Sequence, residues 1–391
     1  MKEKTWLEEI LPADLETCNS ASNFLQSGFW GSFKARFGWN ARSFEITWKN
    51  GKRNSLLVIR RRLGLLFSFA YIPWGPELSE DFPQDFGIRS AALAELAESL
   101  KSFLPRDTAF IRFDPPWYTE GAGTLPPCLA PPFVQAAANV QAPDTVLVSL
   151  EGTRDAILGR MKNKWRYNSK LALKRGVIIK RVDEKGLDCF YTLLKETALR
   201  DHISIHSDKY YKTLFSHCRE YQDNAQLKQR ANSGYSSNTP FLHLYIAEHE
   251  GDTLAAIVVL FRGKEAAYLY GASSNKKRNL MAPYALQIRA MEDAREMGCL
   301  EYDLFGIPPK EDPTHPMAGL YRFKTGFGGR IIHRPGSWDY SCRPIFMKLF
   351  GFAESLRKNY KIRRSYKVQK NHKVRENLGN RGALDNSSED E

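Results

Sequence analysis

The chain has 391 residues and a hydrophobic content of 42%, which suits a soluble protein with one large core or two of ordinary domain size. The longest nearly apolar run, residues 63–74, is too short to span a membrane, and the N-terminal residues do not resemble a signal peptide. Six cysteines without a C-x-x-C pair argue against a disulfide framework and a zinc site. We therefore expect a cytoplasmic protein without a bound metal.

The net charge of +13 is concentrated in two segments. Residues 160–182 and residues 356–375 each carry nine Lys or Arg and no acidic residue, while the rest of the chain holds 39 basic and 44 acidic residues. Such clusters indicate a polyanionic partner, nucleic acid or anionic lipid, although a charged run is often only a solvated surface. Residues 365–391 are polar and charged, and we expect them to be disordered.

The first half of the chain predicts a helical start, a hairpin with a third strand, a helix and two more strands. These elements are residues 1–38 (helical), 43–48, 55–59 and 66–72 (strands), 88–104 (helix), and 108–114 and 144–150 (strands). Lys34 lies beside the aromatic stripe of the first helix, where an ordinary surface lysine is the alternative. Asp114 ends its strand, where side chains tend to face a cleft; the alternative is a turn residue that accepts backbone hydrogen bonds.

The second half predicts helices and antiparallel strands around a polar loop at residues 221–240. The helices are residues 153–176, 187–200 and 281–297, and the strands are residues 177–182, 241–247, 253–261, 265–270 and 300–305. Tyr268 and Tyr270 lie two residues apart and should share one strand face, with burial in the core as the alternative. His202 and His206 fall in an extended stretch without a third ligand, so no metal is expected there.

A glycine-rich stretch, residues 319–329, is the most distinctive motif. Gly326, Gly328 and Gly329 allow the backbone to approach a ligand, and Lys324 sits between two aromatic residues. Such a segment suits an anion or a developing negative charge. The alternative is a glycine-rich turn between two strands with a solvated lysine.

The order of three strands, a helix, a strand and a glycine-rich segment in residues 241–329 resembles the GNAT acyltransferase core. In that fold, coenzyme A binds at a helix N-terminus through a glycine-containing turn. Here the corresponding stretch is Arg278–Pro283, where Met281 and Pro283 replace both glycines. We expect an acyl donor other than coenzyme A and no cofactor.

Several motifs together resemble the Fem family (FemA, FemB and FemX), whose members build the interpeptide bridge of peptidoglycan. The motifs are Asn279-Leu-Met-Ala-Pro-Tyr, Tyr302-Asp-Leu-Phe-Gly306, His315-Pro316 and the 319–329 stretch, with upstream similarity at 24–34, 114–115, 162–176 and 200–211. The resemblance covers nearly all of residues 20–345. Ser204 departs from it where a relative carries an aromatic residue, and the long coiled-coil arm of the FemA type is absent, which favours a FemX-like form.

The resemblance implies an α+β fold with two GNAT-like domains and mixed, mostly antiparallel sheets. The first domain would span residues 1–150, completed by about 334–364, and the second residues 151–333. It further implies an aminoacyltransferase, a monomer, that moves an amino acid from aminoacyl-tRNA to the side-chain amine of a muropeptide precursor, lipid II or UDP-linked. Lys34, Arg200 and Tyr270, or Tyr268 in its place, match positions that handle the muropeptide and its diphosphate.

An aminoacyl ester is already activated, so an amine can attack it without a covalent enzyme intermediate. Lys324 is the candidate for stabilising the oxyanion or the diphosphate, and Asp114 for accepting the proton of the amine. A basic helix would bind the tRNA acceptor stem, and the tail from residue 356 would touch tRNA or the inner membrane surface. The helix candidates are Lys162, Lys164, Arg166, Lys170, Lys174 and Arg175. The alternatives are a GNAT-type N- or O-acyltransferase with another donor acting on a cell-envelope polymer and a non-catalytic RNA- or membrane-binding protein.

Overall fold

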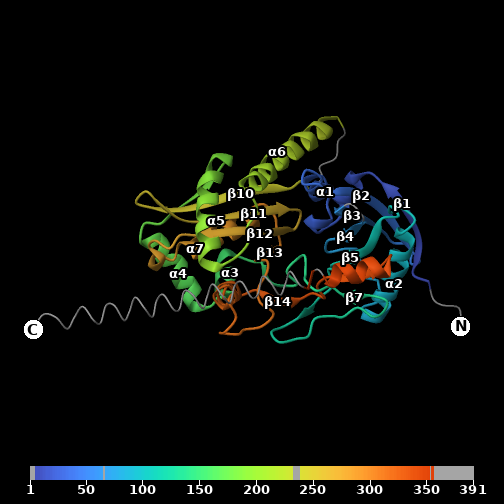
Figure 1. Cartoon of the computed structure of the whole chain (residues 1–391). Helices are drawn as coiled ribbons and strands as arrows, with labels where there is room; N and C mark the ends of the chain where they lie inside the picture. The colour runs from blue at the N-terminus through green and yellow to red at the C-terminus, as the bar shows by residue number, and fades with distance from the viewer. Residues whose placement is uncertain (1–4, 65–66, 232–237, 353, 356–391) are drawn as a thin grey trace, which may run out of the picture.

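Two mixed β-sheets, each flanked by helices, form two lobes that lie side by side (Figure 1). The computed structural model describes residues 5–64, 67–231, 238–352 and 354–355; the expected disordered tail and the whole second basic segment lie outside these ranges. Each sheet has one parallel strand pair, β4 with β5 or β12 with β13, and is otherwise antiparallel. The expected α+β class with mixed, mostly antiparallel sheets is confirmed.

The first sheet has the strand order β1-β2-β3-β4-β5-β15-β7. Its strands are β1 (Leu7–Ala13), β2 (Asn40–Trp48), β3 (Arg53–Leu63), β4 (Phe67–Ile72), β5 (Thr108–Phe113), β15 (Trp338–Ser341) and β7 (Val134–Gln135). Helix α2 (Phe86–Leu100) packs on one face, where Leu93 and Leu96 join a fully buried cluster with Phe44 and Ile46. Helix α1 (Gly28–Ala35) lies on the opposite face, beside the 3₁₀ turns η1 (Leu15–Ser20) and η2 (Phe24–Gln26).

The second sheet has the order β6-β14-β8-β13-β12-β11-β10-β9. Its strands are β6 (Thr119–Glu120), β14 (Arg330–His333), β8 (Asp144–Ser149), β13 (Glu301–Asp303), β12 (Glu265–Ser273), β11 (Asp252–Arg262), β10 (Phe241–His249) and β9 (Ile178–Val182). One face carries α3 (Arg154–Arg160), α4 (Asn163–Lys174), η4 (Arg278–Leu280) and α7 (Ala282–Glu296). The other carries η3 (Glu184–Gly186), α5 (Leu187–Asp201) and α6 (Asp208–Ala231), and α8 (Ala318–Thr325) precedes β14.

The lobes exchange strands. Strand β8, which the range 1–150 assigns to the first domain, lies between β13 and β14 in the second sheet. Strand β15, which follows the second lobe in sequence, returns to pair with β5 in the first sheet. The domain ranges themselves stay a prediction, and neither sheet is built from one continuous segment.

One hydrophobic core is shared by both lobes. Phe29 and Phe33 of α1 pack in the same buried cluster as Leu214 of α6 and Val258 of β11. Because burial of apolar surface is the main favourable term in folding, this shared core fixes the lobes against each other. Side chains along its border therefore occupy a junction between the two sheets.

Three local expectations were wrong. Of the stretch 1–38, the described residues 5–38 are helical only in α1 and in short 3₁₀ turns, because β1 adds an edge strand to β2. The expected loop at 221–240 is helical as far as residue 231, since a buried face that includes Leu214 and Cys218 extends α6. The helix expected at 153–176 breaks at Met161, whose ψ of 152° ends α3 before α4 begins.

Candidate functional site

Lys324 lies in the last turn of α8 with only 5% of its surface exposed. Its Nζ donates to the carbonyl oxygens of Phe305 at 3.2 Å and Gly306 at 3.0 Å, and lies 5.2 Å from the centroid of the Tyr268 ring. Burial lowers the pKa of Lys324 to about 7, although the nearby Asp303 carboxylate acts in the opposite direction. The alternative of a solvated turn lysine is wrong, because the Lys324 side chain is buried.

The Lys324 ammonium sits where two parallel strands separate. Strands β12 and β13 pair only through Glu265–Ala267 and Glu301–Asp303, and β12 then continues to Ser273 without a strand partner on that side in the described chain. Phe305, just beyond β13, has a φ of 59°, a strained backbone conformation for a bulky residue. A cation beside diverging strands can stabilise negative charge that develops in this gap.

The glycines after Lys324 serve packing, not ligand approach. A Cβ at Gly326 would lie 2.0 Å from Cε2 of Trp165, and one at Gly328, which has a φ of 79°, would lie 2.3 Å from the carbonyl oxygen of Arg160. The motif therefore allows the α3–α4 connection to pack closely against α8 and β14. The three glycines are therefore explained by packing, and the role of Lys324 at a functional site stays a prediction.

A second cation, Lys34, is enclosed by the rings of Trp30, Trp39 and Tyr210, which we call the Lys34 cage. The Nζ atom lies 5.5, 5.8 and 5.7 Å from these ring centroids, and no described residue accepts a hydrogen bond from it. Burial and, to a smaller extent, the positive charge of Arg61 together lower the pKa of Lys34 to about 8. Two neighbouring cations that have no counter-ion among the described residues favour binding of an anion.

Arg61 is a residue that sequence reasoning missed. Its guanidinium lies 5.5 Å from the Trp39 ring, whereas Arg60 and Arg62, its neighbours on β3, both pair with Asp107. Within the described residues Arg61 has no ion pair. The three consecutive arginines were the available signal, but alternation along a strand does not show which one meets Lys34.

Tyr268 and Tyr270 do not share a strand face. The register of β12 against β11 shifts between them, so that Tyr268 pairs with Val259 and Tyr270 with Val258. This bulge at Leu269 turns Tyr268 toward Lys324 and Tyr270 toward the shared core. There the Tyr270 hydroxyl donates to Tyr210 Oη at 3.3 Å, which links it to the Lys34 cage.

An aromatic layer connects the two lysines. The Trp30 ring lies 5.4 Å from Phe24, Phe24 lies 6.3 Å from Phe305, and Phe305 lies 5.5 Å from Trp74. These four rings come from both lobes and lead from the Lys34 cage to the carbonyl that Lys324 contacts. Ring contacts thus run from the Lys34 cage to Phe305, whose carbonyl oxygen accepts from Lys324.

Arg200 and Asp114 are held by local partners. Arg200 donates to the carbonyl oxygen of Ser273 at 2.7 Å and pairs with Asp201 at 2.9 Å, at the end of β12. Asp114 follows β5, is 2% exposed, and accepts hydrogen bonds from Tyr71, Ser337 and the Gln141 amide. Burial raises the pKa of Asp114 to about 6, against the opposing effect of these hydrogen bonds. No described contact joins it to Lys324.

The basic helix α4 presents part of its charge to solvent. Lys162, Lys164, Lys170 and Lys174 are exposed. By contrast, the Arg166 side chain donates to the carbonyls of Leu158, Gly159 and Met161, and Arg175 donates to the carbonyl of Asn279. These two arginines therefore hold the helix in place.

Helix α4 also covers the N-terminal turn of α7, where the GNAT core would bind a pyrophosphate. The Trp165 and Tyr284 ring centroids are 5.8 Å apart, and Arg175 bonds to the η4 turn before α7. Met281, at the N-cap position, has a φ of 58°. The missing glycines thus coincide with a helix end that side chains of α4 occupy.

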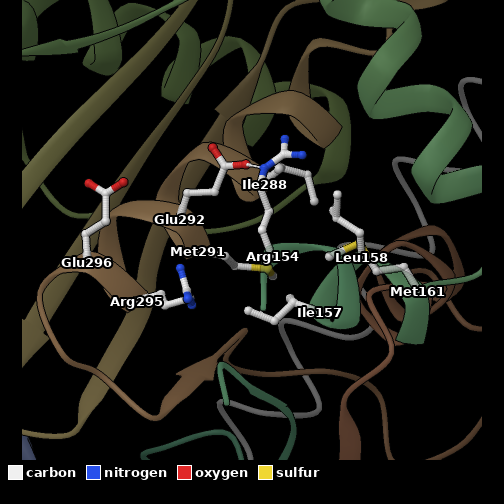
Figure 2. Close-up of a pocket in the computed structure, with 9 residues that line it drawn as sticks. All are labelled: Arg154, Ile157, Leu158, Met161, Ile288, Met291, Glu292, Arg295 and Glu296. Atoms are coloured by element: carbon white, nitrogen blue, oxygen red, sulfur yellow. Dashed lines mark hydrogen bonds and ion pairs between the residues drawn. The ribbon is translucent and has the colours of Figure 1, made fainter. Parts of the chain in front are cut away.

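A separate cavity of about 220 Å³ lies between α3 and α7 (Figure 2). Its floor includes Ile157, Ile288 and Met291, and an ion pair between Arg154 and Glu292 lies at its edge. None of the expected site residues lines it. In the described ranges, no group of three metal-ligating side chains occurs, and no helix has the length and apolar content of a bilayer-spanning segment.

Known proteins resemble this chain over most of its length. A lipid II:glycine glycyltransferase of Staphylococcus aureus strain MRSA252 is 24% identical, covering 82% of this chain and 89% of the relative. One from Staphylococcus saprophyticus is also 24% identical, covering 86% and 92%. The crystal structure of FemX matches with a TM-score of 0.69 and 19% identity, over 88% of this chain and 100% of FemX, and so shares its fold. The FemAB family model matches residues 132–229 and 235–355, more than half of the chain, and the protein therefore belongs to the FemAB family.

Proposed function

We propose that this protein transfers an aminoacyl group from aminoacyl-tRNA to the side-chain amine of a peptidoglycan precursor stem peptide. The observation that carries the proposal is the buried Lys324 ammonium at the point where β12 and β13 separate. The relatives named lipid II:glycine glycyltransferase support both the reaction class and the acceptor.

The acceptor would lie along the inter-lobe surface. Its diphosphate binds at the Lys34 cage, where Lys34 and Arg61 lack a counter-ion among the described residues. The stem peptide then follows the aromatic layer toward Lys324. Its neutral amine attacks the aminoacyl ester, and the Lys324 ammonium stabilises the tetrahedral oxyanion that forms. When the ester C–O bond breaks, the proton of the attacking amine passes to the departing tRNA 3′-oxygen, which leaves as a hydroxyl.

The donor assignment rests on two features of α4. Its packing over the N-terminal turn of α7 disfavours a coenzyme A pyrophosphate there, and its exposed lysines offer a surface for a polyanion. Lys162, Lys164, Lys170 and Lys174 would contact phosphates of the acceptor stem. The tRNA would then approach from the second lobe, on the side opposite the Lys34 cage.

The test is a transfer assay with the purified full-length protein, a UDP-linked muropeptide and a pool of charged tRNAs. Product mass should increase by one or more amino-acid residues, and pre-treatment of the tRNA with RNase should abolish the increase. Lys324→Ala should reduce kcat by about 10²- to 10³-fold, whereas the exposed control Arg53→Ala should not. A mass gain that survives RNase, or that appears with acyl-coenzyme A instead, would contradict the donor assignment.

A further inference from the structure

The last described helix has apolar side chains on both of its sides. It covers residues 344–352, continues at 354–355, and is the red helix beside β5 in Figure 1. On its inner side, Phe346 packs on Phe67 and Phe350 packs on Phe69 and Phe110, with ring centroids 5.0 to 6.1 Å apart. These contacts hold the helix against the first sheet.

An ion pair secures the end of the same helix. Glu354 accepts from the Arg112 guanidinium at 2.9 Å, and Arg112 is also paired with Asp339 of β15. Since Arg112 is almost fully buried, this bond resists solvent screening. The direction of the outer side of the helix is therefore fixed relative to the lobe.

The outer side carries three large apolar residues, which we call the outer stripe: Ile345, Leu349 and Phe352. They are 75%, 58% and 67% exposed, and their spacing of four and three residues places them in one row. A contiguous exposed apolar row on a rigid helix indicates an interaction surface. Arg343 and Lys348 are exposed beside it.

The charge around the outer stripe indicates which class of partner binds there. The next twenty residues in sequence, 356–375, contain nine Lys or Arg and no acidic residue. An apolar row flanked by basic residues matches an anionic bilayer surface, where apolar side chains enter the acyl boundary and cations meet the headgroups. A protein partner would need an acidic rim around an apolar groove, and RNA would gain little from the apolar row.

The outer stripe also lies near the proposed diphosphate site. Phe350 contacts Phe69, and the Phe69 ring lies 5.5 Å from Trp39, which belongs to the Lys34 cage. One layer of aromatic rings thus separates the helix from the cage. If the helix rests on a bilayer, the cage lies close to headgroup level, where the diphosphate of a lipid-linked acceptor is found.

We propose that the outer stripe docks the protein on an anionic membrane surface and brings the Lys34 cage to the diphosphate of a membrane-held acceptor. Docking rests on the helix geometry and the charge of the flanking segment. The link to the acceptor rests on the proposed function. Vesicle binding tests the first part without any transfer activity, so the two can fail separately.

The experiment is flotation of the full-length protein with vesicles of phosphatidylcholine containing about 30% phosphatidylglycerol, an anionic composition. The triple variant Ile345→Ser, Leu349→Ser, Phe352→Ser should bind at least about tenfold more weakly than the wild type. The control Leu125→Ser, Leu199→Ser removes two apolar residues elsewhere that are more exposed than the outer stripe, and it should bind normally. Equal binding of the triple variant and the wild type would overturn the docking surface, as would a loss of tRNA binding with vesicle binding unchanged.

A second, conservative variant tests the same proposal in case the triple variant misfolds. Phe352→Trp keeps an apolar ring in the outer stripe, and its fluorescence should shift to shorter wavelength when anionic vesicles are added. To isolate this residue, the spectrum of the wild type with its eight tryptophans is subtracted. Absence of a shift would contradict insertion. In transfer assays, the triple variant should lose activity on a lipid-linked acceptor in vesicles and keep it on the UDP-linked one; equal loss on both would refute the orienting role.

Discussion

The buried Lys324 ammonium makes the stability of the protein depend on pH in a defined direction. Folding lowers the pKa of Lys324 from 10.5 to about 7, because burial removes the ammonium from water. Between these two pKa values, Lys324 is protonated in the unfolded chain and mostly deprotonated in the folded protein. Stability therefore rises with pH across this window, and Lys324→Met, which binds no proton in either state, removes that contribution.

The magnitude follows from the size of the pKa shift. At about 1.4 kcal/mol per pH unit, the full shift corresponds to roughly 5 kcal/mol. Between about pH 7.5 and 9.5, the wild type should gain roughly 2 to 3 kcal/mol more than Lys324→Met. The variant also leaves the carbonyls of Phe305 and Gly306 without this donor, at about 1 to 3 kcal/mol each and at every pH. The slope of the free energy of unfolding against pH therefore reports the titration of Lys324 alone. The free energy at a single pH also includes the lost hydrogen bonds.

The assay is urea unfolding of the wild type, Lys324→Met and Lys164→Met at three pH values across this window. Lys164 is exposed on α4, so its variant should follow the wild type in parallel. The Lys324→Met line should be shallower by about 1.2 kcal/mol per pH unit. Parallel lines for all three proteins would show that Lys324 keeps its proton on folding, and the argument that burial lowers its pKa would fail.

Three further outcomes are expected. Lys34→Ala and Arg61→Ala should each raise KM by roughly 10- to 100-fold for a diphosphate-bearing acceptor. Neither variant should change KM for a muropeptide that lacks the diphosphate. An equal rise in KM for the two acceptors would show that the cage is not an anion site. Asp114→Asn should lower the free energy of unfolding by about 1 to 3 kcal/mol, because its carboxylate accepts three hydrogen bonds; a 100-fold loss of kcat at unchanged stability would instead indicate proton relay. Replacing Lys164, Lys170 and Lys174 by Ala should flatten the dependence of log affinity for tRNA on log salt by roughly 0.7 to 0.9 per lost phosphate contact, whereas Arg53→Ala should not.

Local periodicity predicted the parts of the fold that depend on neighbouring residues. The strands at 241–273 and helix α7 came close to their observed bounds, because alternation and helical spacing report burial directly. The edge strand β1 was missed, since it gains its stability from pairing with β2 and shows a weak pattern of its own. The polar end of α6 was missed because its stability comes from the buried half of the helix.

For the candidate site too, local sequence patterns predicted single residues but not the contacts that depend on the fold. The sequence identified Lys34 and Lys324 as isolated cations near aromatic residues. It did not show that Tyr210, 176 positions later, completes the cage, because only the shared core brings α6 against α1. The bulge at Leu269 is likewise a property of strand pairing, and it reverses the simple rule that residues two apart share a face.

The strand exchange between the lobes explains why the site needs the whole chain. Lys324 belongs to α8, and the chain that leaves α8 runs through β14 into β15, the strand beside β5 of the first sheet. The Lys34 cage takes Trp30 and Trp39 from the first lobe and Tyr210 from the second. Movement of one lobe relative to the other would separate both the cage and the aromatic layer. An acceptor that binds across this surface must therefore stabilise the lobe arrangement, in proportion to the contacts it makes with each side.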